Sequence, residues 1–433
     1  MEIVEKAKTI KTNTKKSIVT VERNLYNKIK FKTKILRKKV EEKFMKKRFS
    51  LILCLLMILS IAVGCGGNPS GTKDAPAPEN PASASEPKDS GIDWGAKASA
   101  AKGVTPTDYQ GPPEATGPVP AGKKIALVSA NAALQGCVAP LYTIEDICDK
   151  LGWTYQFYDG AGNSAQQNEM ILNAVSWGAD MICVCSVDPV TIQQGLQEAA
   201  DAGIIVTTCS TGIFSPNPPE ELEAGQLNYA YGCSPDYAAS GKGIADWIIA
   251  DAGNQGEVVI VDADEAPSCR ALRVGLLEEL ALSDMEVDDS FWFTGSQVGD
   301  TLIRNVVSYL TNHPDCKYVF VAYDPAAAVI VEGLNQAGMN DVKVISVLGV
   351  QQNIEYIREG NVQVATAAYD NNYMGYAVID QYIRHLNGLD YFEPLGENLP
   401  FTVLDNTNLP EPGTDWNALT YFDYEAEFWG LWK

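Results

Sequence analysis

The feature that most constrains the fold of this chain is a regular alternation of short apolar runs and helical patterns from Gly122 onward. The apolar runs recur roughly every 25–35 residues, and most are continuous, as expected of parallel strands covered by helices on both faces. Between them, apolar side chains repeat every three or four residues, which indicates amphipathic helices. This many strands suits two doubly wound lobes better than one sheet, so we predict an α/β protein with two parallel-sheet lobes.

Capping residues define several helix ends. Ser164 is expected to cap one helix, because Gln167 follows three residues later. Gly178 comes just after that helix, and glycine is the residue type that most often ends one. The expected strands are Lys124–Ser129, Thr154–Tyr158, Met181–Cys185, Ile204–Thr208, Glu257–Val261, Val287–Phe293, Tyr318–Ala322, Val342–Val347 and Val362–Ala368. The main expected helices are Pro140–Leu151, Ser164–Trp177, Pro235–Ala250, Ser268–Leu280, Asp300–Asn312, Pro325–Ala337 and Asn372–Leu386.

Residues 45–65 have the features of an export signal. A basic cluster, Lys46 to Arg48, precedes an apolar run, Phe49–Val63, that is too short for a comfortable transmembrane helix of about 20 residues. The run closes on Ala-Val-Gly-Cys, which resembles a bacterial lipobox, so we predict that Cys65 is lipidated. The alternatives are an ordinary signal peptide, or an uncleaved anchor with an incidental Cys65.

The segments on either side of the signal carry little core-forming sequence. Residues 1–44 form a basic extension that is either upstream of the true start at Met45 or a cytoplasmic tail that docks on anionic lipid. Residues 66–121 are rich in Pro, Ala, Ser and Gly, and we expect them to be a disordered tether.

Charge and composition exclude several classes of function. Residues 1–48 hold 17 basic and 5 acidic side chains, whereas the other 385 residues hold 16 basic and 50 acidic ones. Such an acidic body argues against nucleic-acid binding. With two histidines in the whole chain, and no phosphate loop or HExxH motif, we expect no metal, no cofactor and no catalytic residue. An enzyme on the same kind of fold is the alternative of another class.

The cysteines leave their redox state open. Of ten, Cys54 lies in the signal and Cys65 is the expected lipid site. The other eight are numerous enough to form disulfides in an exported domain. Several lie inside apolar elements, where a free thiol behaves as a small hydrophobe, so we favour mostly free thiols.

The order of the motifs resembles a known family. Lys124–Thr211 contains KIALVSA, DKLGW, GADMICVCSVDP and AADAGIIVTTCS, and is similar to the first lobe of type I periplasmic solute-binding proteins of the ribose/galactose group. The second lobe contains GKGIADWI and NHPDCKYVFVAYDPAAAVIVEGLNQAG in the same order. The resemblance covers roughly residues 123–402.

The resemblance implies how the lobes are joined and what the protein does. The first lobe is expected over residues 122–235 and 371–402, and the second over 236–370 and 403–433, with three hinge crossings near Cys233–Asp236, Tyr369–Asn371 and Pro400–Leu404. A sugar-like small molecule binds between the lobes and favours their closure, and an ABC permease recognises the closed form. The protein is then an extracytoplasmic, membrane-anchored monomer that binds no nucleic acid.

Three charged residues match the family's pattern. Arg270 falls on the cleft arginine, whose forked donors hold two hydroxyls or a carboxylate, although a surface arginine at a helix start is the alternative. Asp236 lies at the first crossing, either as a ligand acceptor or as a helix cap. Asp324 corresponds to the second residue of an Asn-Asp pair.

Other positions depart from that pattern. Ser210 and Thr211 replace an Asp-Arg pair, Tyr323 replaces an asparagine, Leu348 replaces an aspartate and Tyr369 replaces a glutamine. The pocket is therefore expected to be less polar and more aromatic than a pentose site, with the tyrosines either stacked on the ligand or packed at the hinge. A sugar acid, nucleoside or other anionic or aromatic metabolite, bound by a sensor component, remains the alternative ligand.

The C-terminal residues 409–433 are rich in aromatic side chains. So many are rarely left in water, so we expect the tail to pack along the second lobe or the hinge, with a partner-docking strip as the alternative.

Overall fold

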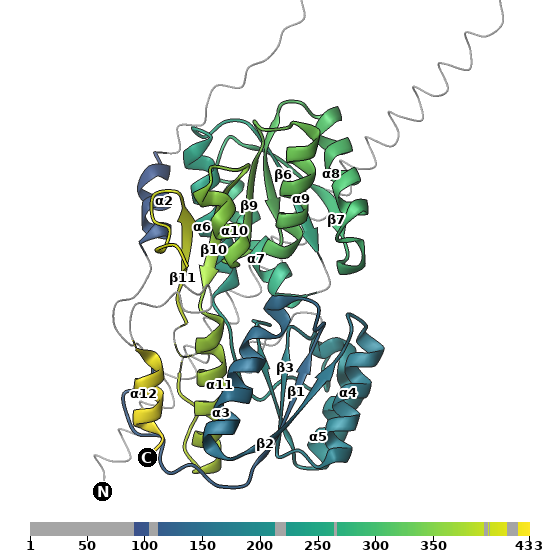
Figure 1. Cartoon of the computed structure of the whole chain (residues 1–433), viewed down its shortest axis with the longest axis vertical. Coiled ribbons are helices and arrows are strands. Elements are labelled where there is room, and N and C mark those ends of the chain that lie inside the picture. Colours follow the sequence, from purple (N-terminus) through teal and green to yellow (C-terminus); the bar gives the residue numbers. More distant parts are fainter. Residues whose placement is uncertain are drawn as a thin grey trace, which may run out of the picture. The chain divides into compact units, whose positions relative to one another are not determined.

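Two β-sheets flanked by helices organise the chain (Figure 1). The computed structural model describes residues 91–103, 111–212, 222–263, 266–393, 397, 399–413 and 423–433. Within them, the first sheet has the strand order β2-β1-β3-β4-β5 and is parallel throughout. The second has the order β11-β10-β9-β8-β6-β7, in which only β11 is antiparallel to its neighbour. The prediction of two doubly wound α/β lobes is confirmed.

The element bounds follow the predicted ones closely where both exist. The strands are β1 (Lys124–Ser129), β2 (Thr154–Asp159), β3 (Met181–Cys185), β4 (Ile205–Cys209), β5 (Gly232–Cys233), β6 (Glu257–Ala263), β7 (Glu286–Phe293), β8 (Cys316–Val321), β9 (Lys343–Leu348), β10 (Gln363–Tyr369) and β11 (Phe401–Asp405). The α-helices are α2 (Trp94–Lys102), α3 (Ala139–Leu151), α4 (Ser164–Trp177), α5 (Gln193–Asp201), α6 (Tyr237–Asp251), α7 (Pro267–Leu280), α8 (Asp300–Asn312), α9 (Asp324–Ala337), α10 (Gln351–Arg358), α11 (Asn371–Leu386) and α12 (Tyr424–Leu431). The 3₁₀ turns are η1 (Gln135–Cys137), η2 (Pro189–Ile192) and η3 (Gly295–Gln297).

The inner strands of each sheet are buried on both faces, which explains their continuous apolar runs. Leu127 of β1 belongs to a core shared with α3 and α11, whereas its neighbour Val128 belongs to a core shared with α4 and α5. In the second sheet, Ile260 of β6 faces α6 and α7, and Val261 faces α8 and α9. Successive residues thus enter opposite cores, as the two-residue period of a strand requires.

The chain passes between the lobes near the three expected positions. It leaves β5 of the first lobe at Cys233 and enters α6 of the second at Tyr237. It returns between Tyr369, at the end of β10, and α11, which packs against α3. The third passage precedes Phe401, where β11 joins the second sheet.

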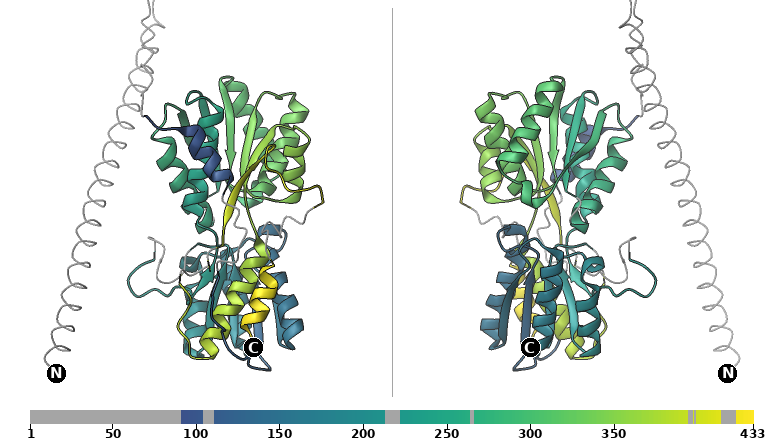
Figure 2. Two further views of the ribbon diagram at one scale, coloured as in Figure 1. Left: turned by 90° about the vertical axis from the view of Figure 1, so that its left-hand side faces the viewer. Right: turned by 90° about the vertical axis from the view of Figure 1, so that its right-hand side faces the viewer.

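Part of the segment expected to be a disordered tether is folded. Helix α2 packs against α6 (Figure 2). Its side chains Trp94, Ala98 and Ala101 are buried. Lys97 Nζ lies 2.8 Å from Asp246 Oδ1 and also pairs with Glu279. Trp94, Ala98 and Ala101 lie on one face of the helix, which explains why α2 packs against α6. The prediction of a disordered tether relied on overall composition and missed this apolar face.

The end of the aromatic tail lies on the first lobe rather than the second, and it contacts the hinge, because the hydroxyl of Tyr424 donates to Asp370 Oδ1 at 3.3 Å. Helix α12 packs against α11 of the first lobe (Figure 2). The rings of Phe428 and Trp432 are stacked on that of Tyr376. Trp432 Nε1 donates to Asp380 Oδ1 at 2.7 Å. The aromatic face that α11 presents supplies the partner surface, so the expected place beside the second lobe is corrected. Trp416, Tyr421 and Phe422 lie outside the described residues.

Two further expectations concern the cap of α4 and the export signal. Asn163, not Ser164, caps α4, because its side chain accepts from Gln166 N at 3.1 Å. The export signal and Cys65 lie outside the described residues. Within those residues, no helix combines the length and the apolar character needed to cross a membrane.

A buried carboxyl pair on the first lobe gives a pH-dependent prediction. Burial raises the pKa of Glu397 well above its usual range, and burial also raises the pKa of Asp380 beside it. The folded protein therefore keeps a proton that the unfolded chain releases, so its stability falls as the pH rises from about 4 through the raised pKa of the pair.

Glu397→Gln keeps the shape of the side chain without its charge. At pH 8 we expect it to raise the melting temperature by about 2 °C or more, whereas near pH 4 the variant and the wild type should melt together. Thermal unfolding across this range is the measurement, with the exposed Glu393→Gln as control. An equal difference at both pH values contradicts the assignment.

Candidate functional site

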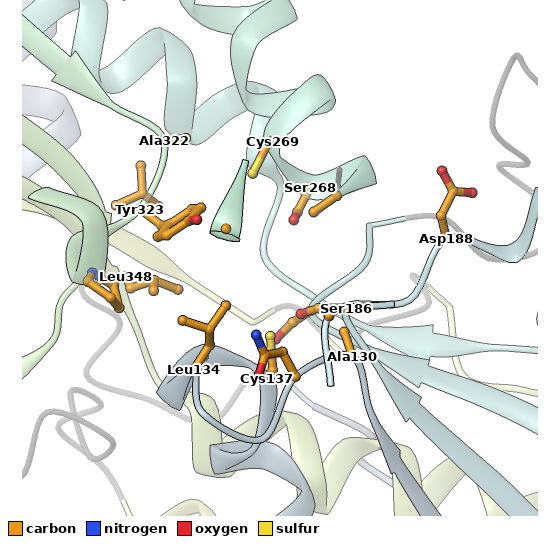
Figure 3. A pocket seen from close by; sticks show the side chains of 18 of the residues that line it. Ala130, Leu134, Cys137, Ser186, Asp188, Ser268, Cys269, Ala322, Tyr323 and Leu348 are labelled. Carbon is orange, nitrogen blue, oxygen red and sulfur yellow. The ribbon is translucent and has the colours of Figure 1, made fainter. Parts of the chain in front are cut away.

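A cavity of about 370 Å³ lies between the two sheets at the carboxyl ends of their strands (Figure 3). Segments that follow β1, β2, β3 and β4 form one wall, and segments that follow β6, β7 and β8 form the other, together with the last residues of β9 and β10. Loops converge at this edge of a parallel sheet, which is where α/β proteins bind ligands. The polar side chains in the wall are Asn131, Ser164, Gln167, Ser186, Asp188, Thr191, Ser210, Tyr237, Ser268, Ser296, Tyr323 and Tyr369.

Backbone strain is concentrated in this cavity. Among the described residues, six that are not glycine have positive φ, and four of them line the cavity: Ala161 (48°), Ser186 (60°), Ser210 (54°) and Leu348 (129°). Ser186 and Ser210 directly follow β3 and β4. Each such conformation costs on the order of 1–3 kcal/mol, and proteins keep this kind of strain mainly at functional sites.

Hydrogen bonds hold the first-lobe wall in place. Asp159, at the end of β2, accepts from the backbone N–H groups of Ala132 at 2.9 Å and Ala161 at 2.8 Å. Gln167 Nε2 donates to Ala130 O at 3.1 Å. These bonds fix the loop after β1 and the start of α4, so polar groups on this wall are positioned before a ligand arrives.

An ion pair joins the lobes at the cavity. Arg270 Nη2, on α7, donates to Asp188 Oδ2, at the start of η2, at 2.7 Å. The other oxygen of Asp188 accepts from Val190 N at 3.0 Å. Among the described residues that line the cavity, Asp188 is the one with a charged side chain, and Arg270 neutralises it. The pair therefore links the two lobes, and the part of the wall that the structure describes carries no net charge.

Three predicted site residues line the cavity: Ser210, Tyr323 and Tyr369. The ring of Tyr369 meets that of Tyr237 edge-on, with centroids 6.0 Å apart and hydroxyls 3.4 Å apart. Burial raises the pKa of both phenols, so they stay neutral and can donate or accept hydrogen bonds. The ring of Tyr323 packs against Phe293, with centroids 5.6 Å apart.

The other predicted residues do not line the cavity. Arg270 reaches it only through Asp188, and Thr211 is buried with its hydroxyl on Cys209 O at 3.0 Å. Asp236 caps α6 by accepting from the N–H of Ala239, which is one of the two roles considered for it. Asp324 is fully buried and points into the second lobe rather than toward the cavity.

A comparison with protein families accounts for this arrangement. Residues 125–390 match the family described as the periplasmic binding protein domain. The chain belongs to the periplasmic binding protein family. Its two lobes with a cavity at the facing strand ends are those of the type I members, as the resemblance implied.

Solved structures show the same fold. An ABC sugar transporter subunit from Rhodobacter sphaeroides is 20% identical, with a TM-score of 0.58 over 66% of this chain and 99% of its own. A sugar ABC transport substrate-binding protein from Bordetella parapertussis is 19% identical, with a TM-score of 0.59 over 75% and 98%. An Agrobacterium vitis solute-binding protein bound to α-D-tagatopyranose is 20% identical, with a TM-score of 0.60 over 70% and 100%. No curated protein sequence matches the chain.

Sequence reasoning missed several residues that line the cavity of this periplasmic binding protein. They share a detectable signal, because each lies in a loop or helix start that follows a strand, or at a hinge crossing. The missed polar residues are Asn131, Ser164, Gln167, Ser186, Asp188, Thr191, Tyr237, Ser268 and Ser296.

The thiols form no recognisable metal site. The eight cysteines in the described part of the chain are thiols rather than disulfides, and Cys183 Sγ lies 3.7 Å from Cys209 Sγ. Burial raises the pKa of Cys185 and Cys209, which keeps these thiols protonated. Among the residues described, no three His, Cys, Asp or Glu side chains come together as a set that could hold a metal ion.

Asp324 gives a prediction that separates structure from binding. Its carboxylate accepts from Thr366 Oγ1 at 2.9 Å, from Val350 N at 2.7 Å and from the hydroxyl of Ser346. Asp324→Ala leaves these buried donors without an acceptor, so we expect a loss of about 3 kcal/mol or more in unfolding free energy. Urea unfolding measures it, with the exposed Asp300→Ala as control. A change below about 1 kcal/mol contradicts the structural role.

Proposed function

We propose that this protein is an extracytoplasmic, lipid-anchored solute-binding protein that captures a neutral, hydroxyl-bearing small molecule and delivers it to an ABC importer. The observation that carries the proposal is the strained cavity between two lobes of periplasmic-binding-protein type, whose polar lining groups are mostly hydroxyls. A sugar or sugar-like compound suits it best. Two solute-binding proteins of similar structure from Agrobacterium vitis have bound α-D-tagatopyranose and allitol, which supports this ligand class.

The charge of the cavity argues for a neutral ligand. An anion needs an uncompensated cation, and the guanidinium of Arg270 is already paired with Asp188. The hydroxyls and amides of the wall match neutral hydrogen-bonding groups instead.

The rings of Tyr237, Tyr323 and Tyr369 support a second candidate. Aromatic side chains stack on the face of a planar ring, so an uncharged nucleoside is the alternative ligand.

The proposed lipid anchor rests on the sequence, and the proposed ABC permease partner rests on the family. The lipobox-like end of the apolar run makes Cys65 the proposed lipidated N-terminus of the mature protein. Mass spectrometry of the protein purified from membranes tests this, because an unmodified N-terminus at another residue contradicts it.

Ligand binding should close the lobes. A ligand that contacts both walls favours the closed form over the open one. A thermal-shift panel of sugars, polyols and nucleosides identifies a ligand, and small-angle scattering of the exported domain should then show a smaller radius of gyration. A ligand that raises the melting temperature without changing this radius contradicts the hinge mechanism.

The Asp188–Arg270 pair provides a second test. If it acts by holding the lobes together, Asp188→Ala, Arg270→Ala and the double variant should each weaken ligand binding by a similar factor, about threefold to tenfold. If Arg270 also contacts the ligand, Arg270→Ala should weaken binding further in the Asp188→Ala background. Calorimetric titration of the four proteins measures both outcomes, and unchanged affinity in all three variants removes the pair from the mechanism.

A further inference from the structure

The wall of the cavity is divided into a polar and an apolar part. Figure 3 shows Ser186, Ser268 and Asp188 toward one side and Leu134 and Leu348 toward the other. The polar part also holds amide and hydroxyl groups from the loop after β1 and the start of α4. The apolar part is continued by Gly136, Val347 and Ala322, and Tyr323 adds a ring with one hydroxyl on the same side (Figure 3).

Leu348 is the central residue of the apolar part. It ends β9 with a φ of 129°, a conformation that side-chain-bearing residues rarely adopt. A Cβ on Gly136 of the other lobe would lie 3.2 Å from a methyl carbon of Leu348, so this side chain extends across the cavity to the first lobe. The backbone therefore keeps a strained geometry that presents an aliphatic side chain where the two lobes meet.

An aliphatic surface at this place discriminates between ligands. A ligand hydroxyl that packs against the Leu348 side chain loses its water and gains no hydrogen bond from that side chain, which weakens binding by roughly tenfold or more. A methyl group in the same place buries apolar surface and makes close contacts instead. The opposite edge of the ligand still needs hydroxyls, because the polar part holds donors and acceptors.

We propose that the cavity selects a neutral ligand with hydroxyls along one edge and a deoxy or methyl-bearing carbon at the other, a class represented by the 6-deoxyhexoses. Leu348 is the residue that sets this preference. The inference rests on the proposed function, since it names the substrate class of the same cavity.

Matched sugar pairs test the preference directly. L-fucose and L-galactose, L-rhamnose and L-mannose, and D-quinovose and D-glucose differ only by the hydroxyl on C6. Calorimetric titration should show at least one 6-deoxy sugar binding at least tenfold more tightly than its hydroxylated counterpart. Equal or tighter binding of the hydroxylated member in every pair that binds overturns the inference.

The same titrations separate failure of the inference from failure of the function. If all six sugars fail while another sugar or a polyol binds and closes the lobes, the deoxy preference is wrong and the function stands. If no sugar, polyol or nucleoside binds, the proposed function is wrong as well.

A substitution tests the role of Leu348. Leu348→Asn is close to isosteric and places an amide against the ligand edge, so it should reduce the preference for the deoxy sugar at least tenfold. Leu282→Asn, at an exposed leucine of the second lobe, is the matched control and should leave the preference unchanged. A preserved preference in Leu348→Asn overturns the assignment.

Leu134→Asn adds a second amide in the same apolar part. It should move the preference in the same direction, and it keeps the test available if Leu348→Asn does not fold. A folded Leu134→Asn protein that keeps the full preference overturns the proposed apolar selection.

Discussion

The structure depends on the direction of its strands: in both sheets the parallel strands end at the same cavity. Every loop that leaves one of these ends can reach a ligand, so the sheets fix the position of the site while the loops fix its chemistry. Strand β11 is informative by contrast. It runs antiparallel to β10, and none of its residues lines the cavity.

The Asp188–Arg270 pair connects the electrostatics of the cavity with the contact between lobes. Asp188 places a negative charge in a wall of hydroxyls, amides and aromatic rings, and the guanidinium of Arg270 neutralises this charge from the other lobe. An opening motion that separates the lobes must break this pair and expose both charges to water, where their hydration offsets much of the lost attraction. The pair can therefore favour contact between the lobes without preventing opening. A ligand that adds hydrogen bonds to both walls supplies the remaining preference for the closed form.

The sequence predicts the sheets well because their strands are buried on both faces and their helices have clear ends. The prediction from sequence fails at α2 and α12, which pack onto the outside of lobes that other elements form. Only Trp94 among the buried residues of α2 is large, so composition made the segment resemble a tether. The surface that receives α12 is a row of tyrosines on α11, and nothing in the tail's own sequence indicates it.

The site shows the same limit on a smaller scale. Tyr323 and Asp324 are adjacent after β8, yet Tyr323 lines the cavity and Asp324 is buried among Ser346, Thr366 and the start of α10. Sequence places both residues at the correct end of the strand. It does not give the direction of each side chain, because the first turn of a helix sends successive residues toward different surroundings.

Both ends of the folded chain also span the lobes, which adds a constraint to the hinge. On the second lobe, α2 and β11 are joined, since Thr402 Oγ1 donates to Lys102 O at 3.1 Å. On the first lobe, the two ends meet again, because Thr116 N donates to Leu431 O at 3.0 Å and Asp380 accepts from both Thr116 and Trp432. The three hinge crossings are thus accompanied by two more connections. Because these contacts anchor each end of the folded chain to both lobes, the extra segments at both ends are mechanically coupled to opening and closing.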